Sequence, residues 1–236
     1  MNFIHIAGYK FIPLDNLVTL RAELKQATQA LSLLGTILIS SEGINVMLAG
    51  TPEAIESIKN RLNEQFGGMR FRETPSDIQP FQKMVVKLKK EIISMGTPDL
   101  LMKQAPAPRI TAQELKQWLD EKRDVVLLDT RNDYEVAAGT FENAIDLGIK
   151  YFRHFPDAIA KLKTDKPIVT FCTGGIRCEK AALALQAQGF NNVYQLDGGI
   201  LRYFDECGQA HYQGTCFVFD ERVSESSADS QSSCSH

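Results

Sequence analysis

A cysteine followed by two glycines and an arginine has the clearest chemical potential in this sequence. Residues 172–177 read Cys-Thr-Gly-Gly-Ile-Arg and stand between the apolar run Ile168–Phe171 and a helical pattern that starts at Cys178. Glycines allow successive backbone N–H groups to point inward, and the following helix adds its positive end. Together with the charge of Arg177, this arrangement favours a thiolate at Cys172 over a thiol. We therefore expect an accessible nucleophile whose pKa lies well below the free value of about 8.5.

The length of this loop narrows its chemistry. Phosphatases of the tyrosine type use Cys-x5-Arg, a loop wide enough to wrap a phosphate, whereas the loop here is Cys-x4-Arg. The tighter loop is better suited to a thiolate that carries one extra sulfur atom. Cys178, in the first turn of the helix, is either a packing residue or a redox partner. We assign Cys172 as the candidate catalytic residue, and the anion-binding loop comprises Thr173, Gly174, Gly175, Ile176 and Arg177.

Short apolar runs that alternate with helical patterns must position this loop. Strands are predicted at 125–128, Ile168–Phe171 and Val193–Leu196, and helices at 157–162 and 179–188. This alternation is typical of an α/β domain with a parallel sheet covered on both faces by helices. Ligands bind such sheets at the carboxyl ends of the strands. Two more groups of residues follow predicted strands there: Asp129-Thr130-Arg131 and Asp197-Gly198-Gly199.

The amino-terminal part of the chain shows a different pattern, in which strands and helices predict an α+β domain. We expect the order strand, helix, two strands, helix and then one or two strands, and the order βαββαβ is that of the ferredoxin-like sandwich. Gly35 is expected to end the first helix, Thr51 to cap the second, and Gly67-Gly68 to end it. Residues 41–43 are expected to form a hairpin turn. The predicted strands are Phe3–Phe11, 36–40, 45–48 and 84–93.

Composition and the positions of proline and serine residues divide the chain into four parts. We predict a ferredoxin-like domain at 1–95, a proline-containing linker at 96–109, a catalytic α/β domain at 110–223 and a disordered serine-rich tail at 224–236. A capping box at Thr111 and Glu114 marks the first helix of the catalytic domain.

Composition also excludes several classes of protein. The five cysteines are an odd number without a Cys-x-x-Cys pair, and the four histidines are scattered, which argues against a disulfide framework and a structural zinc site. We expect no metal. No apolar run approaches the roughly 18 residues of a membrane span, and the amino end has no signal-peptide pattern, so we expect a cytoplasmic protein without membrane contact. The oligomeric state is not indicated.

A cluster of lysines is the candidate contact for a polyanion. Because side chains alternate along a strand, Lys83, Lys87 and Lys89 are expected to share one face of the strand at 84–93. This face either contacts RNA phosphates or is an ordinary solvated outer face. The net charge of −3 does not by itself indicate a nucleic-acid binder.

Residues 108–216 resemble a rhodanese domain. The resemblance rests on Asp129-Thr130-Arg131 with Glu135, on the loop at 172–177 and on Leu196-Asp197-Gly198-Gly199. Up to about residue 223 the whole chain is similar to the bacterial tRNA uridine hydroxylase family, which joins an acylphosphatase-like domain to a rhodanese domain. The segments that carry this similarity are 41–45, 171–179 and 216–220. Relatives in that family often continue into a cysteine-rich tail, where this chain has serines, so we expect no metal there.

This resemblance implies the oxygen-dependent formation of 5-hydroxyuridine at the wobble position of tRNA. It implies that Cys172 acts through a persulfide, that Arg177 stabilises the anionic sulfur, and that Asp129 and Arg131 support the end of the sheet. It also implies dioxygen as a co-substrate and tRNA as the partner. No signature of flavin, haem or iron occurs in the sequence, so no cofactor is expected.

Two alternatives use the same domain in other ways. A sulfurtransferase would move sulfur from thiosulfate or a protein persulfide through the same Cys172 and Arg177. A regulatory module would bind a partner through a catalytically silent rhodanese fold. Intact Cys172 and Arg177 weigh against the second alternative.

Overall fold

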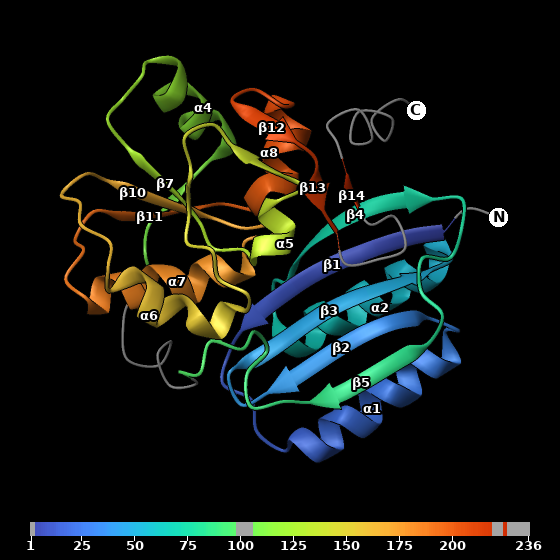
Figure 1. Ribbon diagram of the computed structural model, residues 1–236. Helices are drawn as coiled ribbons and strands as arrows, with labels where there is room; N and C mark the ends of the chain where they lie inside the picture. Colours follow the sequence, from blue (N-terminus) through green and yellow to red (C-terminus); the bar gives the residue numbers. More distant parts are fainter. Residues whose placement is uncertain (1–2, 98–105, 219–223, 226–236) are drawn as a thin grey trace. The chain divides into compact units, whose positions relative to one another are not determined.

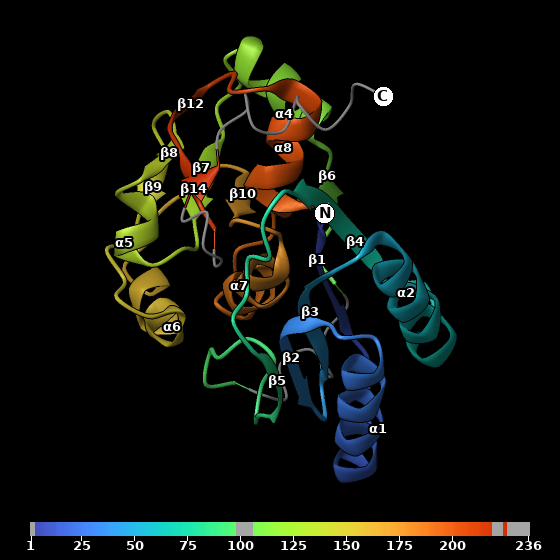
Figure 2. The same ribbon diagram turned by 90° about the vertical axis from the view of Figure 1, so that its right-hand side faces the viewer.

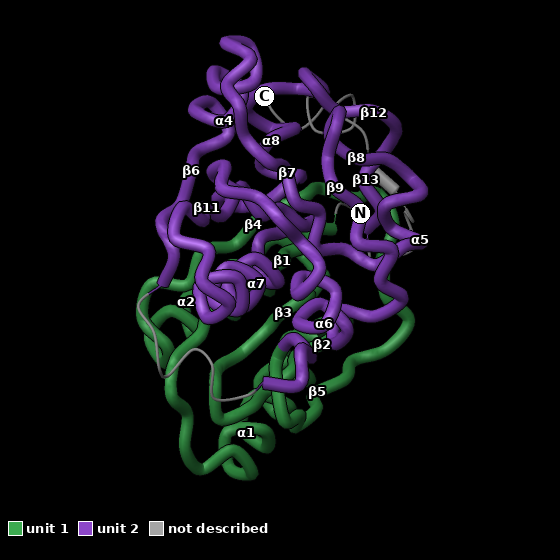
Figure 3. Tube along the Cα trace, turned by 60° about the vertical axis from the view of Figure 1, so that its left-hand side comes forward, with its two compact units in different colours: residues 1–92 green, residues 93–236 purple. Residues whose placement is uncertain are grey.

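The computed structural model describes residues 3–97, 106–218 and 224–225 of the 236-residue chain (Figure 1). The chain divides into two compact units, Met1–Ile92 and Ile93–His236, which Figure 3 shows in different colours. Each unit has its own sheets and its own buried core. Within the described residues, no helix combines the length and the apolar character that crossing a membrane requires.

Unit 1 is a five-stranded sheet with two helices on one of its faces (Figure 2). The strand order is β4-β1-β3-β2-β5, and neighbours among the first four are antiparallel. Alternate strand side chains such as Ile6 and Val46 pack against helix residues such as Leu24 and Ile58 in one apolar core. The βαββαβ order confirms the ferredoxin-like prediction. The elements are β1 Phe3–Phe11, α1 Leu17–Ala30, β2 Leu34–Ser40, β3 Gly43–Gly50, α2 Pro52–Phe66, β4 Arg70–Ser76 and β5 Met84–Leu88.

The last strand of the ferredoxin-like order is not the one that we predicted. We assigned that place to a long strand at 84–93, but β4, Arg70–Ser76, takes it and pairs with β1. The strand β5 is shorter, Met84–Leu88, and lies parallel to β2 at the opposite edge of the sheet. The strand β4 contains exposed charges and a proline, which an edge strand tolerates but which are not typical of a strand sequence. For this reason the sequence did not indicate it.

Gly35 does not end the first helix, as we expected it to. Helix α1 ends at Ala30, and Gly35 lies inside β2 with a φ of +130°. A Cβ atom at this position would lie 2.1 Å from the carbonyl oxygen of Met47 on β3. The glycine is therefore explained by the close approach of two strands rather than by a helix end.

Three other local predictions for unit 1 are confirmed. Ser41 and Glu42 connect β2 to β3 in a tight hairpin whose first pair is Ser40 and Gly43. The Thr51 hydroxyl accepts a hydrogen bond from the Ala54 N–H at 3.3 Å and so caps α2. Gly67 and Gly68, both with positive φ, follow the last residue of that helix.

Unit 2 is built on a parallel sheet with the strand order β6-β11-β10-β7-β9, and all four of its strand pairs are parallel. This confirms the α/β prediction. Its helices and strands up to the catalytic loop are β6 Arg109–Ile110, α4 Ala112–Asp120, β7 Val126–Asp129, α5 Asp133–Val136, β8 Gly139–Phe141, β9 Ile145–Asp146, η1 Phe152–His154, α6 Phe155–Ile159 and β10 Ile168–Phe171. After the loop come α7 Ile176–Ala187, β11 Val193–Leu196, α8 Gly199–Cys207, β12 Tyr212–Gly214, β13 Cys216–Phe217 and β14 Ser224–Glu225.

Two apolar cores lie on the two faces of this sheet. Val169 and Phe171 of β10 point into one core with residues of α4 and α8, whereas Ile168 points into the other with residues of α6 and α7. Because both faces are buried, the strand β10 is apolar or hydroxylic throughout and fully buried. The sheet thus holds the end of β10, where Cys172 follows, between two layers of helices (Figure 1).

Several bounds in unit 2 differ from the predictions. Arg109, which we placed in the linker, begins β6, and much of that predicted linker, 98–105, lies outside the described residues. Helix α6 begins earlier than predicted, at Phe155, and α7 begins at Ile176 because Gly175 supplies its left-handed cap. Ser224 and Glu225, which we assigned to the disordered tail, form β14 and pair with β13. The remainder of that tail, 226–236, is outside the described residues.

Candidate functional site

The loop after β10 wraps its backbone around the sulfur of Cys172. The Gly175 N–H donates a hydrogen bond to Cys172 Sγ at 3.1 Å. Gly175 has a φ of +92°, a conformation that glycine adopts without strain, and it is the residue from which α7 starts. The same turn therefore ends the loop, aims an amide at the sulfur and points the positive end of a helix toward it.

The environment of Cys172 favours the thiolate. Burial raises the pKa of this thiol, but it is outweighed by the hydrogen bond from Cys178, the charge of Arg177 and the amides of Arg177 and Gly175, which together lower the pKa to about 6. Cys178 behaves in the opposite way, because burial and the neighbouring Cys172 raise its pKa well above the ordinary value. The two sulfurs are thus arranged as an anion and a neutral donor.

The cysteine is less accessible than we predicted. We expected an exposed thiolate, but Cys172 is 0% exposed, since the loop and the elements around it enclose the sulfur. Gly174 at the tip of the loop is exposed, and no atom lies within 4 Å of the place where its Cβ would be. The tip of the loop, rather than the sulfur itself, is the part of the site that solvent reaches.

Arg177 does not project freely into the loop but is held by a carboxylate. Its Nη1 and Nη2 atoms lie 2.6 and 2.7 Å from the two carboxylate oxygens of Glu135, and both side chains are buried. Burial opposes the charge of Arg177, but the pairing with Glu135 prevails and raises its pKa. The Thr173 hydroxyl donates to the same carboxylate at 3.5 Å. A two-pronged pair of this kind fixes the orientation of a guanidinium.

Glu135 is a site residue that our reasoning from the sequence missed. We named it only as part of the rhodanese resemblance, without a role. Its carboxylate accepts a hydrogen bond from the Asn132 N–H at 3.1 Å in a capping box, so α5 itself orients the side chain. The Asn-x-x-Glu spacing was the available signal, but it predicts a helix start and not a partner for Arg177.

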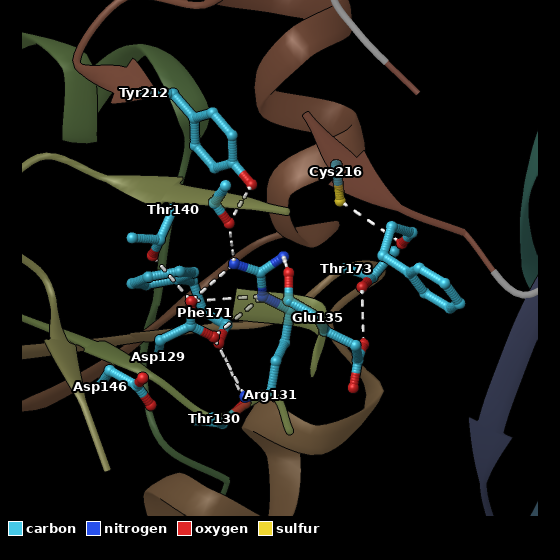
Figure 4. A network of polar contacts seen from close by, with 12 residues as sticks. Asp129, Thr130, Arg131, Glu135, Thr140, Asp146, Phe171, Thr173, Tyr212 and Cys216 are labelled. Atoms are coloured by element: carbon cyan, nitrogen blue, oxygen red, sulfur yellow. Dashed lines mark hydrogen bonds and ion pairs between the residues drawn. The ribbon is translucent and has the colours of Figure 1, made fainter. Parts of the chain in front are cut away.

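Asp129 and Arg131 form a second buried ion pair (Figure 4). Arg131 Nη2 lies 2.7 Å from Asp129 Oδ2 and 2.6 Å from the Gly139 carbonyl oxygen. Asp129 also accepts a hydrogen bond from the Thr140 hydroxyl at 2.8 Å. These contacts tie the end of β7 to β8, and neither side chain has exposed surface. The contacts of Asp129 and Arg131 thus join two strands of unit 2 to each other.

Helix α8, which we did not predict, contacts the loop from its other side. The N–H groups of Ile200 and Leu201 donate to the carbonyl oxygens of Cys172 and Thr173 at 2.9 and 3.1 Å. This approach requires Gly199, because a Cβ there would lie 2.4 Å from the Cys172 carbonyl oxygen. The loop carbonyls are therefore held outward by α8 while the Gly175 amide faces the sulfur.

The predicted RNA-contact lysines belong to unit 1. Lys87 lies in β5, Lys83 and Lys89 flank that strand, and all three are exposed. Their role in RNA binding stays a prediction. Across the residues that the structure describes, no three His, Cys, Asp or Glu side chains are grouped so that they could hold a metal ion.

Comparison with known proteins places both units in described domain families. Residues 3–92 match the UPF0176 acylphosphatase like domain, and residues 111–206 match the Rhodanese-like domain. The chain is 50% identical over 232 residues to the tRNA uridine(34) hydroxylase of Thiobacillus denitrificans, with 94% of each chain covered. It is 48% identical over 233 residues to the tRNA uridine(34) hydroxylase of Cupriavidus taiwanensis, with 94% of this chain and 83% of the relative covered.

Proposed function

Since the chain belongs to the tRNA uridine(34) hydroxylase family, we propose that it hydroxylates uridine 34 of tRNA and that Cys172 is its catalytic residue. The single observation that supports this role of Cys172 is the environment of its sulfur, which lowers the pKa to about 6. At neutral pH such a cysteine is mostly thiolate, the reactive form of the side chain. The proposed product is 5-hydroxyuridine, and the proposed place of action is the cytoplasm.

In this proposal the loop holds a sulfur anion before and after it accepts another sulfur atom. The thiolate of Cys172 attacks the outer sulfur of a persulfide donor, the sulfur–sulfur bond of the donor breaks, and the donor thiolate leaves. The negative charge of the resulting Cys172 persulfide is stabilised by the Gly175 amide and by Arg177. Glu135 keeps the guanidinium in place, and α8 keeps the loop carbonyls turned away. Dioxygen is the co-substrate that supplies the hydroxyl oxygen, and its other oxygen atom leaves as water with two electrons and two protons from an external thiol reductant.

The proposal is tested by nucleoside mass spectrometry on tRNA from a strain that lacks the gene. We expect 5-hydroxyuridine to fall in the deletion strain and to return when the unaltered chain is supplied. Cys172→Ser is expected not to restore it, because a serine hydroxyl is not ionised at neutral pH and cannot carry the extra sulfur.

Cys207→Ser is the matched control, since Cys207 is a partly exposed cysteine at the end of α8, outside the loop. It should restore the nucleoside as the unaltered chain does. Full restoration by Cys172→Ser would reject the nucleophile, and an unchanged nucleoside level in the deletion strain would reject the reaction. In the latter case, purified protein offered thiosulfate and cyanide would test sulfur transfer by the same cysteine.

A further inference from the structure

A short exposed segment next to α5 carries an aromatic ring with two cations close to it. Lys150, Tyr151 and Arg153 lie in the connection from β9 to α6, and all three are exposed. Tyr151 is 45% exposed, and few large apolar residues in the described part of the chain are exposed to this extent. The guanidinium carbon of Arg153 is 4.6 Å from the centre of the Tyr151 ring, and Lys150 Nζ is 5.9 Å from it.

This segment is anchored, so the exposed side chains stand on a defined support. Phe152 and Phe155, which alternate with the exposed residues, are buried in the core under α6 and α7, with ring centres 5.6 Å apart. The Ile149 carbonyl oxygen, immediately before Lys150, accepts a hydrogen bond from the Asp133 N–H at 2.9 Å. An exposed ring on such a support loses little conformational freedom when a ligand stacks on it.

The same anchor connects the segment to the catalytic loop. Asp133 is the first residue of α5, and Glu135 in the same helical turn holds Arg177 through two hydrogen bonds. Only one backbone hydrogen bond and one turn of helix therefore separate the exposed segment from the loop of Cys172.

The charge of this segment differs from that of its surroundings. Residues 96–236 contain 15 Lys and Arg against 20 Asp and Glu, whereas residues 147–156 contain Lys150 and Arg153 and no acidic residue. In the part of unit 2 that the structure describes, Arg153 is the one arginine that has no carboxylate partner. The others pair with acids: Arg109 with Glu179 and Asp197, Arg123 with Glu121, Arg131 with Asp129, Arg177 with Glu135 and Arg202 with Asp197 and Glu206.

We propose that Lys150, Tyr151 and Arg153 bind the single-stranded anticodon loop of the tRNA substrate. An unpaired base stacks on Tyr151, and the two cations contact the phosphates on either side of it. Unpaired bases are available in the anticodon loop, where uridine 34 lies, and not in the paired stems. This inference rests on the proposed function, because it names the part of the substrate that the same site receives.

The test measures the affinity of the full chain for an unmodified tRNA transcript. Stacking of one base on an aromatic residue accounts for about 5- to 150-fold in the dissociation constant, so Tyr151→Ala should raise the Kd by a factor in this range. Tyr151→Phe keeps the ring and should bind as the unaltered chain does. Arg153→Ala should raise the Kd and reduce its dependence on salt by about one phosphate contact.

Arg123→Ala is the matched control, because Arg123 also lies over an aromatic ring, 5.2 Å from the centre of Trp118. It differs in having Glu121 as a partner, and it follows α4, whose core lies on the other face of the sheet from that of α6. We expect it to leave the Kd unchanged. A Tyr151→Ala variant that binds the transcript with unaltered affinity would overturn the proposal.

A blunt RNA duplex without a loop separates single-strand recognition from general attraction to RNA. Tyr151→Ala should weaken binding of the transcript and leave binding of the duplex as it is, and an equal loss for both RNAs would overturn the anticodon-loop assignment. A failure of the proposed reaction can be distinguished from a failure of the proposed RNA contact. If the unaltered chain binds the transcript with the Tyr151 dependence but forms no hydroxylated nucleoside, the reaction is rejected and the RNA contact stands.

Discussion

The protonation state of Cys172 depends on groups that offset the effect of burial on its pKa. Burial alone would raise the pKa of this thiol, and the Cys178 hydrogen bond, the charge of Arg177 and two backbone amides bring it to about 6. Removing any of these groups should therefore shift the pKa upward while the sulfur stays buried. Cys178 is the simplest to remove, because its own raised pKa leaves it a neutral packing residue.

The rate of alkylation of Cys172 by iodoacetamide should follow this pKa. Measured by mass spectrometry of the Cys172 peptide, the rate should rise with a midpoint near pH 6, whereas a free thiol has its midpoint at about 8.5. Limited access of the reagent to the enclosed sulfur slows alkylation at every pH, so it lowers the plateau of the rate without moving its midpoint. Cys178→Ala should move the midpoint upward, and Cys207→Ser should leave it in place. A midpoint near that of free cysteine in the unaltered chain would contradict the assigned environment.

The same shift has a definite sign for stability. The folded pKa of Cys172, about 6, lies below the value of about 8.5 for a free cysteine, so the folded state prefers the thiolate. The stabilisation by this group is complete above the unfolded pKa and is lost as the pH falls through the folded one. Between these two values the free energy of unfolding of the unaltered chain should rise with pH more steeply than that of Cys172→Ser.

Glu135 offers a direct test of the buried ion pair. Glu135→Gln leaves the guanidinium of Arg177 buried without its counter-charge, and we expect a loss of about 3–5 kcal/mol in the free energy of unfolding measured with urea. Glu142→Gln, at an exposed position, should change it by less than about 0.5 kcal/mol. Replacing both partners, Glu135→Leu with Arg177→Met, should cost less than Glu135→Gln alone. A loss as small as that of the control would mean that the pair is not buried in solution.

At the scale of the elements, the sequence predicts the parts whose signals are local. The strands Ile168–Phe171 and Val193–Leu196 were predicted with their observed bounds, because buried runs between turn residues have sharp ends. The strands β6 and β9 were missed since two residues carry no periodicity. The pairing of Arg177 with Glu135 joins residues 42 positions apart, so no spacing in the sequence predicts it.

Helix α8 was missed for a different reason. It begins at Gly199 after the cap residue Gly198, and we expected these glycines only as residues that follow a predicted strand. The need for Gly199 arises from the approach of the helix to the catalytic loop. Both glycines have positive φ, and the Cβ-free surface of Gly199 faces the carbonyls of Cys172 and Thr173. The element that holds the loop is thus defined by tertiary contact and not by local preference.

Gly199→Ala should separate this contact from a general backbone effect. Gly199 and Gly189 both have positive φ, so an alanine at either costs about 1–2 kcal/mol of stability. Only at Gly199 does the new methyl collide with the loop, since nothing lies within 4 Å at Gly189. We expect Gly199→Ala to raise the midpoint of Cys172 alkylation and Gly189→Ala to leave it unchanged. Equal midpoints in both variants would show that α8 does not position the loop.

At the scale of the whole molecule, the two units divide the proposed work. Unit 2 holds the reactive sulfur and the buried pairs of Arg177 with Glu135 and of Arg131 with Asp129, whereas the core of unit 1 joins its sheet to two helices. Residues 1–95 carry 11 Lys and Arg against 9 Asp and Glu, so the first unit is the more basic part of the chain. A substrate as large and as negatively charged as tRNA can use both.

The lysines of unit 1 are tested by the salt dependence of tRNA binding. If Lys83, Lys87 and Lys89 contact phosphates, replacing all three by alanine should reduce the slope of log Kd against log salt by about 2–3. The reason is that each phosphate contact releases about one counterion from the RNA on binding, and three such contacts are lost. A matched triple of exposed cations from elsewhere, Lys25, Arg61 and Lys122, changes the net charge equally and should alter the slope far less. If the two triple variants behave alike, the lysines at β5 act only through net charge, and the phosphate contacts of the tRNA lie on another surface.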